Sequence, residues 1–274
     1  MASLIEKIDK FRQKTLPKQV TLRGRKWHVI DTGDNSFQGP VLVMLPGTLG
    51  NADIFFNQIT TLGKRIRIIA MAYPLVTDID LITGDIVSLL NRLGIEKASI
   101  LGSSYGGFVA QIFAQNHPTR IDTLFIGNSL TDIELVRPGF PPIEQLIKIA
   151  PKMLRAQISG QMANWPEPEK IFAEVKAFLQ RELAEYLPLR APKTRLSAIF
   201  LRTKPVLPAI PDSQIVIIDC DDDPLIPVTV RKDIHKRYPK AERHSLPSGG
   251  HFPYLTRSAV YTDILETRLL PSVS

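Results

Sequence analysis

Short apolar runs recur along the chain and do not alternate with polar residues. They are "VLVMLP" from residue 41, "RIRIIAMAYP" from 65, "ASILG" from 98, "DTLFIGNS" from 122 and "QIVIID" from 214. Strands that are buried on both faces of a parallel sheet have this pattern. Helical patterns fill the gaps, among them "ADIFFNQITTLG", "DIDLITGDIVSLLNRLG" and "GFVAQIFAQN". The alternation predicts an α/β fold, with a mostly parallel central sheet flanked by helices and joined by right-handed crossovers.

Two further elements are predicted before the first apolar run. The segment 4–11 has apolar residues on one face of a helix, and Ser3 and Glu6 have the spacing of a capping box. The stretch "QVTLRGRKWHVIDTG" is typical of two strands around Gly24, so it predicts a hairpin.

The alternation of strands and helices stops after Asn128 and Ser129. Residues 130–211 have helical and irregular patterns, and eleven of the 22 prolines lie between Pro138 and Pro211. Helices there are expected to be short or bent, because proline interrupts a helix. The strand pattern resumes with "QIVIID". We therefore expect one α/β core, made of residues 1–129 and 212–274, with a helical cap inserted at 130–211.

A candidate nucleophile lies in "GSSYGG", which contains the pattern G-x-S-x-G between a predicted strand and a predicted helix. The sharp turn of a nucleophile elbow crowds the residues two before and two after its tip, so both must be very small. Gly102 and Gly106 flank Ser104 in this way. With Ser103 at the tip, a leucine and a tyrosine would take those positions. Ser104 is therefore the candidate nucleophile, and Ser103 is expected to pack or to hydrogen-bond.

A serine hydroxyl needs a general base, and the chain has five histidines. His251 lies in "PSGGHFPYLTRS", a glycine-rich loop between a predicted strand and the last helix. It also comes late in the chain, as the order Ser…Asp…His of such folds requires. His28, His117, His235 and His244 are expected to be structural or solvated.

Four aspartates crowd the segment "IIDCDDDPLIP", which follows a predicted strand: Asp219, Asp221, Asp222 and Asp223. One of them is expected to orient the base. The spacing to Pro227 favours Asp223, with Asp222 close behind. Crowded carboxylates raise one another's pKa, so they are not all expected to point inward.

The remaining requirement is an oxyanion hole. The residue after the nucleophile, Tyr105, supplies one backbone N–H, and the loop "MLPGTLGNAD" supplies the other, for which Thr48 is the candidate. Asn128 and Ser129 end a predicted strand beside this site. They either contact the substrate or cap that strand.

Taken in order, "LPGTLG", "GSSYGG", "DDDPLIP" and "GGHF" resemble the α/β-hydrolase fold family over most of the chain. The resemblance implies a serine hydrolase, esterase-like in cleaving an acyl bond, with a catalytic triad and without a cofactor or a metal. Its substrate would be a small ester-like molecule. C–C bond hydrolysis, cofactor-free oxygenation and perhydrolysis remain alternative chemistries on the same fold.

A closer resemblance is to the maspardin branch of this fold, carried by "FFNQ", "GSSYGGFVAQ", "GNSLTD" and "YPKAERHSLPSGGHFPYLTRSA". That branch is regarded as non-catalytic and protein-binding, which implies a protein partner as the alternative function. Its members have Asn at the position of His251, so the histidine here restores a plausible triad. An ungapped comparison with the branch favours Asp222 over Asp223, and the acid stays open.

Composition adds a few limits. The 274 residues are 44% hydrophobic, enough for one sizeable core with a lid. The single cysteine, Cys220, excludes an intramolecular disulfide. The charged N-terminal stretch "MASLIEKIDKFRQK" has no apolar signal region, and no apolar run approaches the length of a membrane span. These features predict a cytoplasmic protein.

The net charge of +7 comes from basic residues that are spread along the chain, without the basic stripe of a nucleic-acid-binding protein. Residues 130–211 carry twelve Lys and Arg against eight Asp and Glu, which leaves +4 of the total there. This excess predicts a mild preference for anionic substrates or partners.

Overall fold

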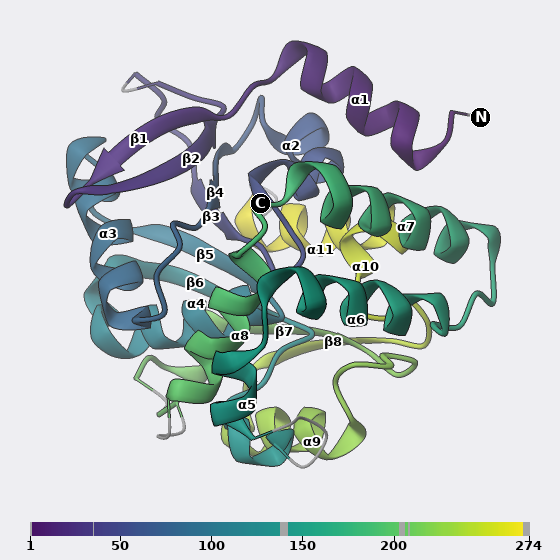
Figure 1. Ribbon diagram of the computed structural model, residues 1–274. Helices are drawn as coiled ribbons and strands as arrows, with labels where there is room; N and C mark the ends of the chain where they lie inside the picture. Colours follow the sequence, from purple (N-terminus) through teal and green to yellow (C-terminus); the bar gives the residue numbers. More distant parts are fainter. Residues whose placement is uncertain (1, 35, 138–141, 203–205, 208, 271–274) are drawn as a thin grey trace.

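An eight-stranded sheet forms the centre of the computed structural model, which describes residues 2–34, 36–137, 142–202, 206–207 and 209–270 (Figure 1). The strand order is β1-β2-β4-β3-β5-β6-β7-β8. The strands β1 and β2 are antiparallel to each other, β2 is antiparallel to β4, and all other neighbours are parallel. The strands are β1 (Lys18–Leu22), β2 (Arg25–Asp31), β3 (Val41–Leu45), β4 (Arg67–Ala72), β5 (Ala98–Ser103), β6 (Ile121–Gly127), β7 (Ile215–Cys220) and β8 (Glu242–Leu246). The predicted mostly parallel α/β sheet is confirmed.

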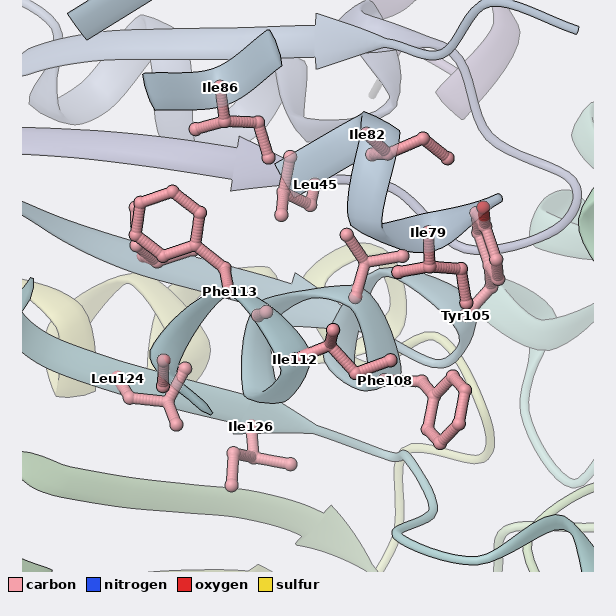
Figure 2. Packing of buried hydrophobic residues seen from close by; sticks show 14 of the residues in the cluster. Leu45, Ile79, Ile82, Ile86, Tyr105, Phe108, Ile112, Phe113, Leu124 and Ile126 are labelled. Carbon is pink, nitrogen blue, oxygen red and sulfur yellow. The ribbon is translucent and has the colours of Figure 1, made fainter. Parts of the chain in front are cut away.

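Helices cover both faces of this sheet, which explains the unbroken apolar runs. Successive side chains of a strand point to opposite faces. In β6, Leu124 and Ile126 join one buried cluster, and Phe125 joins the other. Figure 2 shows the first cluster, where side chains of α3 and α4 pack over the sheet. The core helices are α2 (Phe56–Leu62), α3 (Ile79–Arg92), α4 (Tyr105–Asn116), α9 (Val228–Arg237), α10 (Pro253–Thr256) and α11 (Ser258–Leu269), with short 3₁₀ turns η1 (Ala52–Phe55), η2 (Pro118–Arg120) and η6 (Asp212–Gln214).

The predicted N-terminal elements are present. Helix α1 (Leu4–Lys14) begins with the capping box of Ser3 and Glu6, in which each side chain accepts from the other residue's backbone N–H. The hairpin between β1 and β2 turns at Arg23 and Gly24, whose φ angles of 48° and 82° are both positive. Positive φ at both central positions is what the commonest two-residue hairpin turn requires.

A helical segment joins β6 to β7, and we call residues 130–211 the β6–β7 segment. Proline occupies the first turn of two of its helices, α6 and α8, where no backbone donor is lost. Pro138 and the rest of 138–141 lie outside the described residues. The elements are η3 (Ile133–Leu135), α5 (Ile143–Lys148), α6 (Pro151–Ala163), α7 (Lys170–Arg181), the π-helical turn η5 (Glu182–Tyr186) and α8 (Ala191–Leu201).

Helix α1 is tied to the β6–β7 segment, and the two lie side by side in Figure 1. The guanidinium of Arg12 donates to Asp53 at 2.7 Å and to both carboxylate oxygens of Glu182 at 2.9 and 2.7 Å. Arg181 makes a bidentate pair with Asp9 at 2.8 Å. The first helix therefore anchors the C-terminal end of α7 and the π turn that follows it.

No helix in the described ranges combines the length and the hydropathy that crossing a bilayer requires.

Candidate active site

The candidate site lies at the carboxyl ends of the parallel strands, where open α/β sheets bind ligands. Each of its parts comes from a loop that follows a different strand. Thr48 follows β3, Ser104 follows β5, Asn128 follows β6, Asp223 follows β7 and His251 follows β8. The parallel order β3-β5-β6-β7-β8 brings these loops to one edge of the sheet.

Ser104 stands at the tip of a sharp turn between β5 and α4. Its φ of 55° and ψ of −120° make it one of three non-glycine residues with positive φ in the described chain. Such a conformation costs on the order of 1–3 kcal/mol and persists only where the surroundings enforce it. Here the Ser104 N–H donates to the Gly127 carbonyl at 2.8 Å, and its own carbonyl accepts from the Ser129 hydroxyl at 2.7 Å.

The flanking glycines are sterically required. A Cβ atom on Gly102 would lie 2.0 Å from the carbonyl oxygen of Gly106, and one on Gly106 would lie 2.0 Å from the carbonyl oxygen of Leu45. On the oxyanion side, a Cβ on Gly47 would come within 3.2 Å of the Cβ of Ser104. The turn and the loop after β3 therefore touch through their backbones.

The two adjacent serines have different surroundings. Ser103 is 2% exposed, and its hydroxyl hydrogen-bonds with that of Tyr254 beneath the turn. Ser104 instead lines a cavity, which His251 also lines. The hydroxyl that faces open space is thus that of Ser104.

The His251 ring is paired with Asp223. Its Nδ1 lies 2.9 and 3.1 Å from the two carboxylate oxygens, and the Asp223 side chain is fully buried. Burial alone would raise the pKa of Asp223, but the charge and hydrogen bond of His251, the Asn128 amide and the Leu225 N–H outweigh it and lower the pKa. The bond from the Asn128 amide is 2.6 Å long, and that from the Leu225 N–H is 2.7 Å long. Asp223 is therefore held as a carboxylate.

Asp222 does not reach the histidine ring. Its carboxylate accepts from the backbone N–H groups of Gly249 and Gly250 at 3.2 and 2.8 Å. Gly250 has a φ of 61°, a conformation that glycine adopts without strain. Asp222 thus fixes the loop that carries His251, and the ungapped comparison that favoured it as the histidine's partner does not agree with this geometry.

The other aspartates and histidines have separate partners. Asp219 accepts from His235 at 2.7 Å, and Asp221 pairs with Arg231 at 2.8 Å. His244 pairs with Glu242 on β8 at 2.7 Å. His117 packs its ring against Phe113 at the end of α4, and His28 is exposed on β2.

The cavity beside Ser104 has a volume of about 190 Å³ and is walled mostly by apolar side chains. None of its described lining residues is Lys, Arg, Asp or Glu, so the positive charge of the β6–β7 segment does not face it. This lining gives no support to the expected preference for anions. The apolar wall consists of Leu49, Leu130, Ile133, Val136, Ile158, Trp165, Leu196, Ile199, Phe200, Leu225, Ile226 and Phe252.

A second cavity of about 350 Å³ adjoins the first. The two share Trp165, His251 and Phe252, and the second is also lined by Lys176 and Glu169. His251 thus contributes to both spaces, one apolar and one with charged groups at its wall.

Two backbone N–H groups are free near Ser104. Within the described chain, neither Thr48 nor Tyr105 donates its N–H to a protein acceptor. Tyr105 is the first residue of α4, where the helix dipole favours negative charge. The loop of Thr48 is held by Arg195 of α8, a residue that the sequence patterns did not single out.

Two other observations bear on chemistry. Cys220 is buried, and burial together with the charges of Asp222 and Asp223 raises the pKa of its thiol, which disfavours the nucleophilic thiolate form. In the described ranges no three His, Cys, Asp or Glu side chains are grouped as metal ligands would be.

The chain belongs to the alpha/beta hydrolase family, whose sequence pattern matches residues 42–264. Within that family it is similar to maspardin from Homo sapiens, with 30% identity over 255 residues that cover 89% of this chain and 79% of the relative. Both resemblances are thereby confirmed. Among solved structures, it is similar to an esterase from Exiguobacterium antarcticum (TM-score 0.69, 20% identity, 93% and 99% of the two chains) and to an enol-lactonase from Burkholderia xenovorans LB400 (TM-score 0.73, 17% identity, 90% and 98%).

Proposed function

We propose that this protein is a serine hydrolase that cleaves esters with an apolar acyl group. One observation carries the proposal: Ser104, at the strained tip of the turn, and His251, which is paired with the buried Asp223, line the same cavity. The carboxylate holds His251 through Nδ1, which leaves Nε2 as the nitrogen that can accept a proton. Two structural neighbours are an esterase and an enol-lactonase by name, and both names describe acyl–oxygen cleavage.

In the first half-reaction, the Ser104 oxygen attacks the ester carbonyl carbon while its proton passes to His251. The carbonyl oxygen becomes an oxyanion, and we assign its binding to the backbone N–H groups of Thr48 and Tyr105. When the tetrahedral intermediate collapses, the carbon–oxygen bond to the alcohol breaks. The alcohol leaves with the proton that His251 had taken, and an acyl-serine remains.

In the second half-reaction, water attacks the acyl-serine and gives its proton to His251. Collapse releases the carboxylic acid and returns the proton to the Ser104 oxygen. Asp223 stabilises the imidazolium each time it forms, and Asn128 holds Asp223 in place from the end of β6. We propose the β6–β7 segment as the cap that covers this chemistry, because it supplies much of the cavity wall.

The cavity favours a neutral acyl chain over an anionic one. Burying a charged group among apolar side chains is costly unless it is paired, and this wall offers no cation within the described residues. The alcohol part of the ester would leave toward the second cavity, which also borders His251.

The proposal is tested by the intact mass of the protein after incubation with a fluorophosphonate, followed by assays with p-nitrophenyl esters. We expect one adduct on the wild type and none on Ser104→Ala. Ser103→Ala is the matched control, because it removes the neighbouring hydroxyl from a buried position. It should be labelled and should turn over esters. Absence of an adduct on the folded wild type would overturn the proposal.

The similarity to maspardin supports a second candidate, a binding protein on a hydrolase scaffold. In that case the pocket would be inert, and a specific partner would be retained equally by the wild type and by His251→Ala. Normal labelling of Ser104 would count against this candidate, since an adaptor needs no activated serine.

A further inference from the structure

Arg195 of α8 is the most deeply buried arginine of the β6–β7 segment. It is 3% exposed, and within the described residues it has no carboxylate partner. Burial lowers its pKa, and the phenols of Tyr73 and Tyr105 offset that effect only in part. Arginines are almost never buried in this way unless they are paired. The position of its donors explains why this one is tolerated.

The terminal nitrogen Nη1 of Arg195 reaches across 148 residues of sequence to the loop after β3. It donates to the carbonyl oxygens of Gly47 at 3.0 Å, Thr48 at 2.9 Å and Gly50 at 2.7 Å. The guanidinium also lies over the ring of Tyr73, with Cζ 5.1 Å from the centroid, and the Tyr73 hydroxyl donates to the Pro46 carbonyl at 3.1 Å. One cation therefore holds three carbonyls of a single loop.

The bond to Gly47 acts directly on the proposed oxyanion donor. The carbonyl of Gly47 and the N–H of Thr48 belong to one planar trans peptide, so they point in opposite directions. A guanidinium that holds this carbonyl fixes the direction of the Thr48 N–H. Hydrogen bonds in a chain also polarise one another, so a cation on the carbonyl makes the N–H a stronger donor.

We propose that Arg195 is a positioning residue for the oxyanion hole, through which the β6–β7 segment completes the catalytic site. The inference rests on the proposed hydrolase function. According to this inference, Arg195 stabilises the transition state, in which the carbonyl oxygen of the substrate gains negative charge. Binding of the uncharged ground state should depend on it much less.

The test compares Arg195→Met and Arg195→Lys with a matched control, Arg155→Met. Arg155 is another arginine of the same segment whose guanidinium donates to backbone carbonyls, those of Ala184 and Leu187, at 3.3 and 2.7 Å. It does not line the cavity of Ser104. Circular dichroism and thermal unfolding establish that each variant is folded.

Three quantities are measured for each protein. The first is kcat/KM for p-nitrophenyl butyrate. The second is the inhibition constant of butylboronic acid, which forms a tetrahedral anionic adduct with an activated serine. The third is the inhibition constant of pentanamide, which carries the same butyl chain but has a planar carbonyl carbon where the boronic acid adduct has a tetrahedral boron.

In Arg195→Met we expect kcat/KM and boronic acid affinity to fall together, by roughly 10- to 100-fold, which is somewhat less than the loss of a whole oxyanion donor. Pentanamide should bind as it does to the wild type. Arg195→Lys should show intermediate losses of kcat/KM and of boronic acid affinity, because an ammonium keeps the positive charge but not the planar array of guanidinium N–H donors. Arg155→Met should match the wild type in all three measurements.

Equal loss of boronic acid and pentanamide binding in Arg195→Lys would overturn the proposal, since a purely structural role predicts it. Unchanged constants in Arg195→Met would also overturn it. If Arg195→Met is unfolded, the comparison of the two inhibitors in Arg195→Lys decides. A wild type that takes no fluorophosphonate adduct overturns the proposed hydrolase function first, and the assignment of Arg195 falls with it.

Discussion

Asp222 and Asp223 are adjacent in the chain, yet their carboxylates bind different parts of the same loop. Asp223 receives the His251 ring, and Asp222 receives the backbone N–H groups of Gly249 and Gly250. One aspartate orients the histidine side chain, and its neighbour holds the backbone from which that side chain extends. The two residues are therefore expected to differ sharply when each is changed alone.

In Asp223→Asn we expect kcat to fall on the order of 10³- to 10⁴-fold, because an amide stabilises neither the imidazolium nor the required tautomer. Asp222→Asn should keep activity within about tenfold and lower stability by about 1–2 kcal/mol, since a charge-assisted bond to the loop is weakened. Steady-state kinetics and urea unfolding measure both effects. If Asp222→Asn lost more activity than Asp223→Asn, Asp222 and not Asp223 would be the carboxylate that orients His251.

The pH dependence of stability should reveal the support that Asn128 gives to Asp223. The folded-state pKa of Asp223 is lowered, so its ionised form stabilises the protein above the unfolded pKa of about 3.9, and that stability is lost as the pH falls through the folded pKa. In Asn128→Gly, one of the lowering contributions is gone. Glycine is chosen because residue 128 has a φ of 39°.

The stability gap between wild type and Asn128→Gly should therefore be widest above about pH 4 and should narrow toward pH 3. Urea unfolding between pH 3 and pH 6 measures it. Any effect of the glycine on chain entropy is the same at each pH and cancels in the comparison. A gap that is equal at both ends would show that Asn128 does not favour the ionised carboxylate.

Two glycine substitutions should move stability in opposite directions. Gly106→Ala places a methyl group 2.0 Å from the Leu45 carbonyl oxygen, so we expect a loss of at least about 3 kcal/mol. Gly160 lies within α6, and a Cβ atom added there would meet no atom within 4 Å apart from the backbone of its own helix. Gly160→Ala should therefore raise the free energy of unfolding by up to about 1 kcal/mol through helix propensity. Thermal and urea unfolding test the pair. If Gly106→Ala is as stable as the wild type, the turn is not as tight as described.

The size of the apolar cavity should determine how kcat/KM depends on the length of the acyl chain. We expect kcat/KM to rise about fourfold for each methylene that becomes buried, following about 0.8 kcal/mol per group, and to fall once the chain exceeds the cavity. Leu196→Trp makes the cavity smaller, so the acyl chain length with the highest kcat/KM should become shorter. Leu189→Trp is the control, because Leu189 is 49% exposed and lies outside the lining. An optimum that moves equally in both variants would contradict this assignment of the pocket.

Much of the fold followed from local patterns, because a strand buried on both faces is continuously apolar and a parallel sheet needs helices between its strands. The choice of Ser104 over Ser103 could also be made from the sequence, since it depends only on which neighbouring residues lack a side chain. Both inferences need residues no more than a few positions apart.

The remaining parts of the site depend on contacts across long stretches of chain. Which aspartate faces His251 is decided by a turn after β7, where successive side chains diverge, and four aspartates within five positions look alike in sequence. Asn128 stood at a predicted strand end with two possible roles. Arg195 had no local signal at all, because its acceptors are main-chain carbonyls, which every residue possesses.

The buried thiol of Cys220 has a practical consequence. It is the chain's one cysteine, and it is closed off from solvent at the end of β7. Cysteines introduced together at Ile147 on α5 and at Val260 on α11, which are 47% and 48% exposed, would therefore be the two thiols open to maleimide dyes. A doubly labelled protein of this kind would report the distance between the β6–β7 segment and the core during turnover, without first removing a native cysteine.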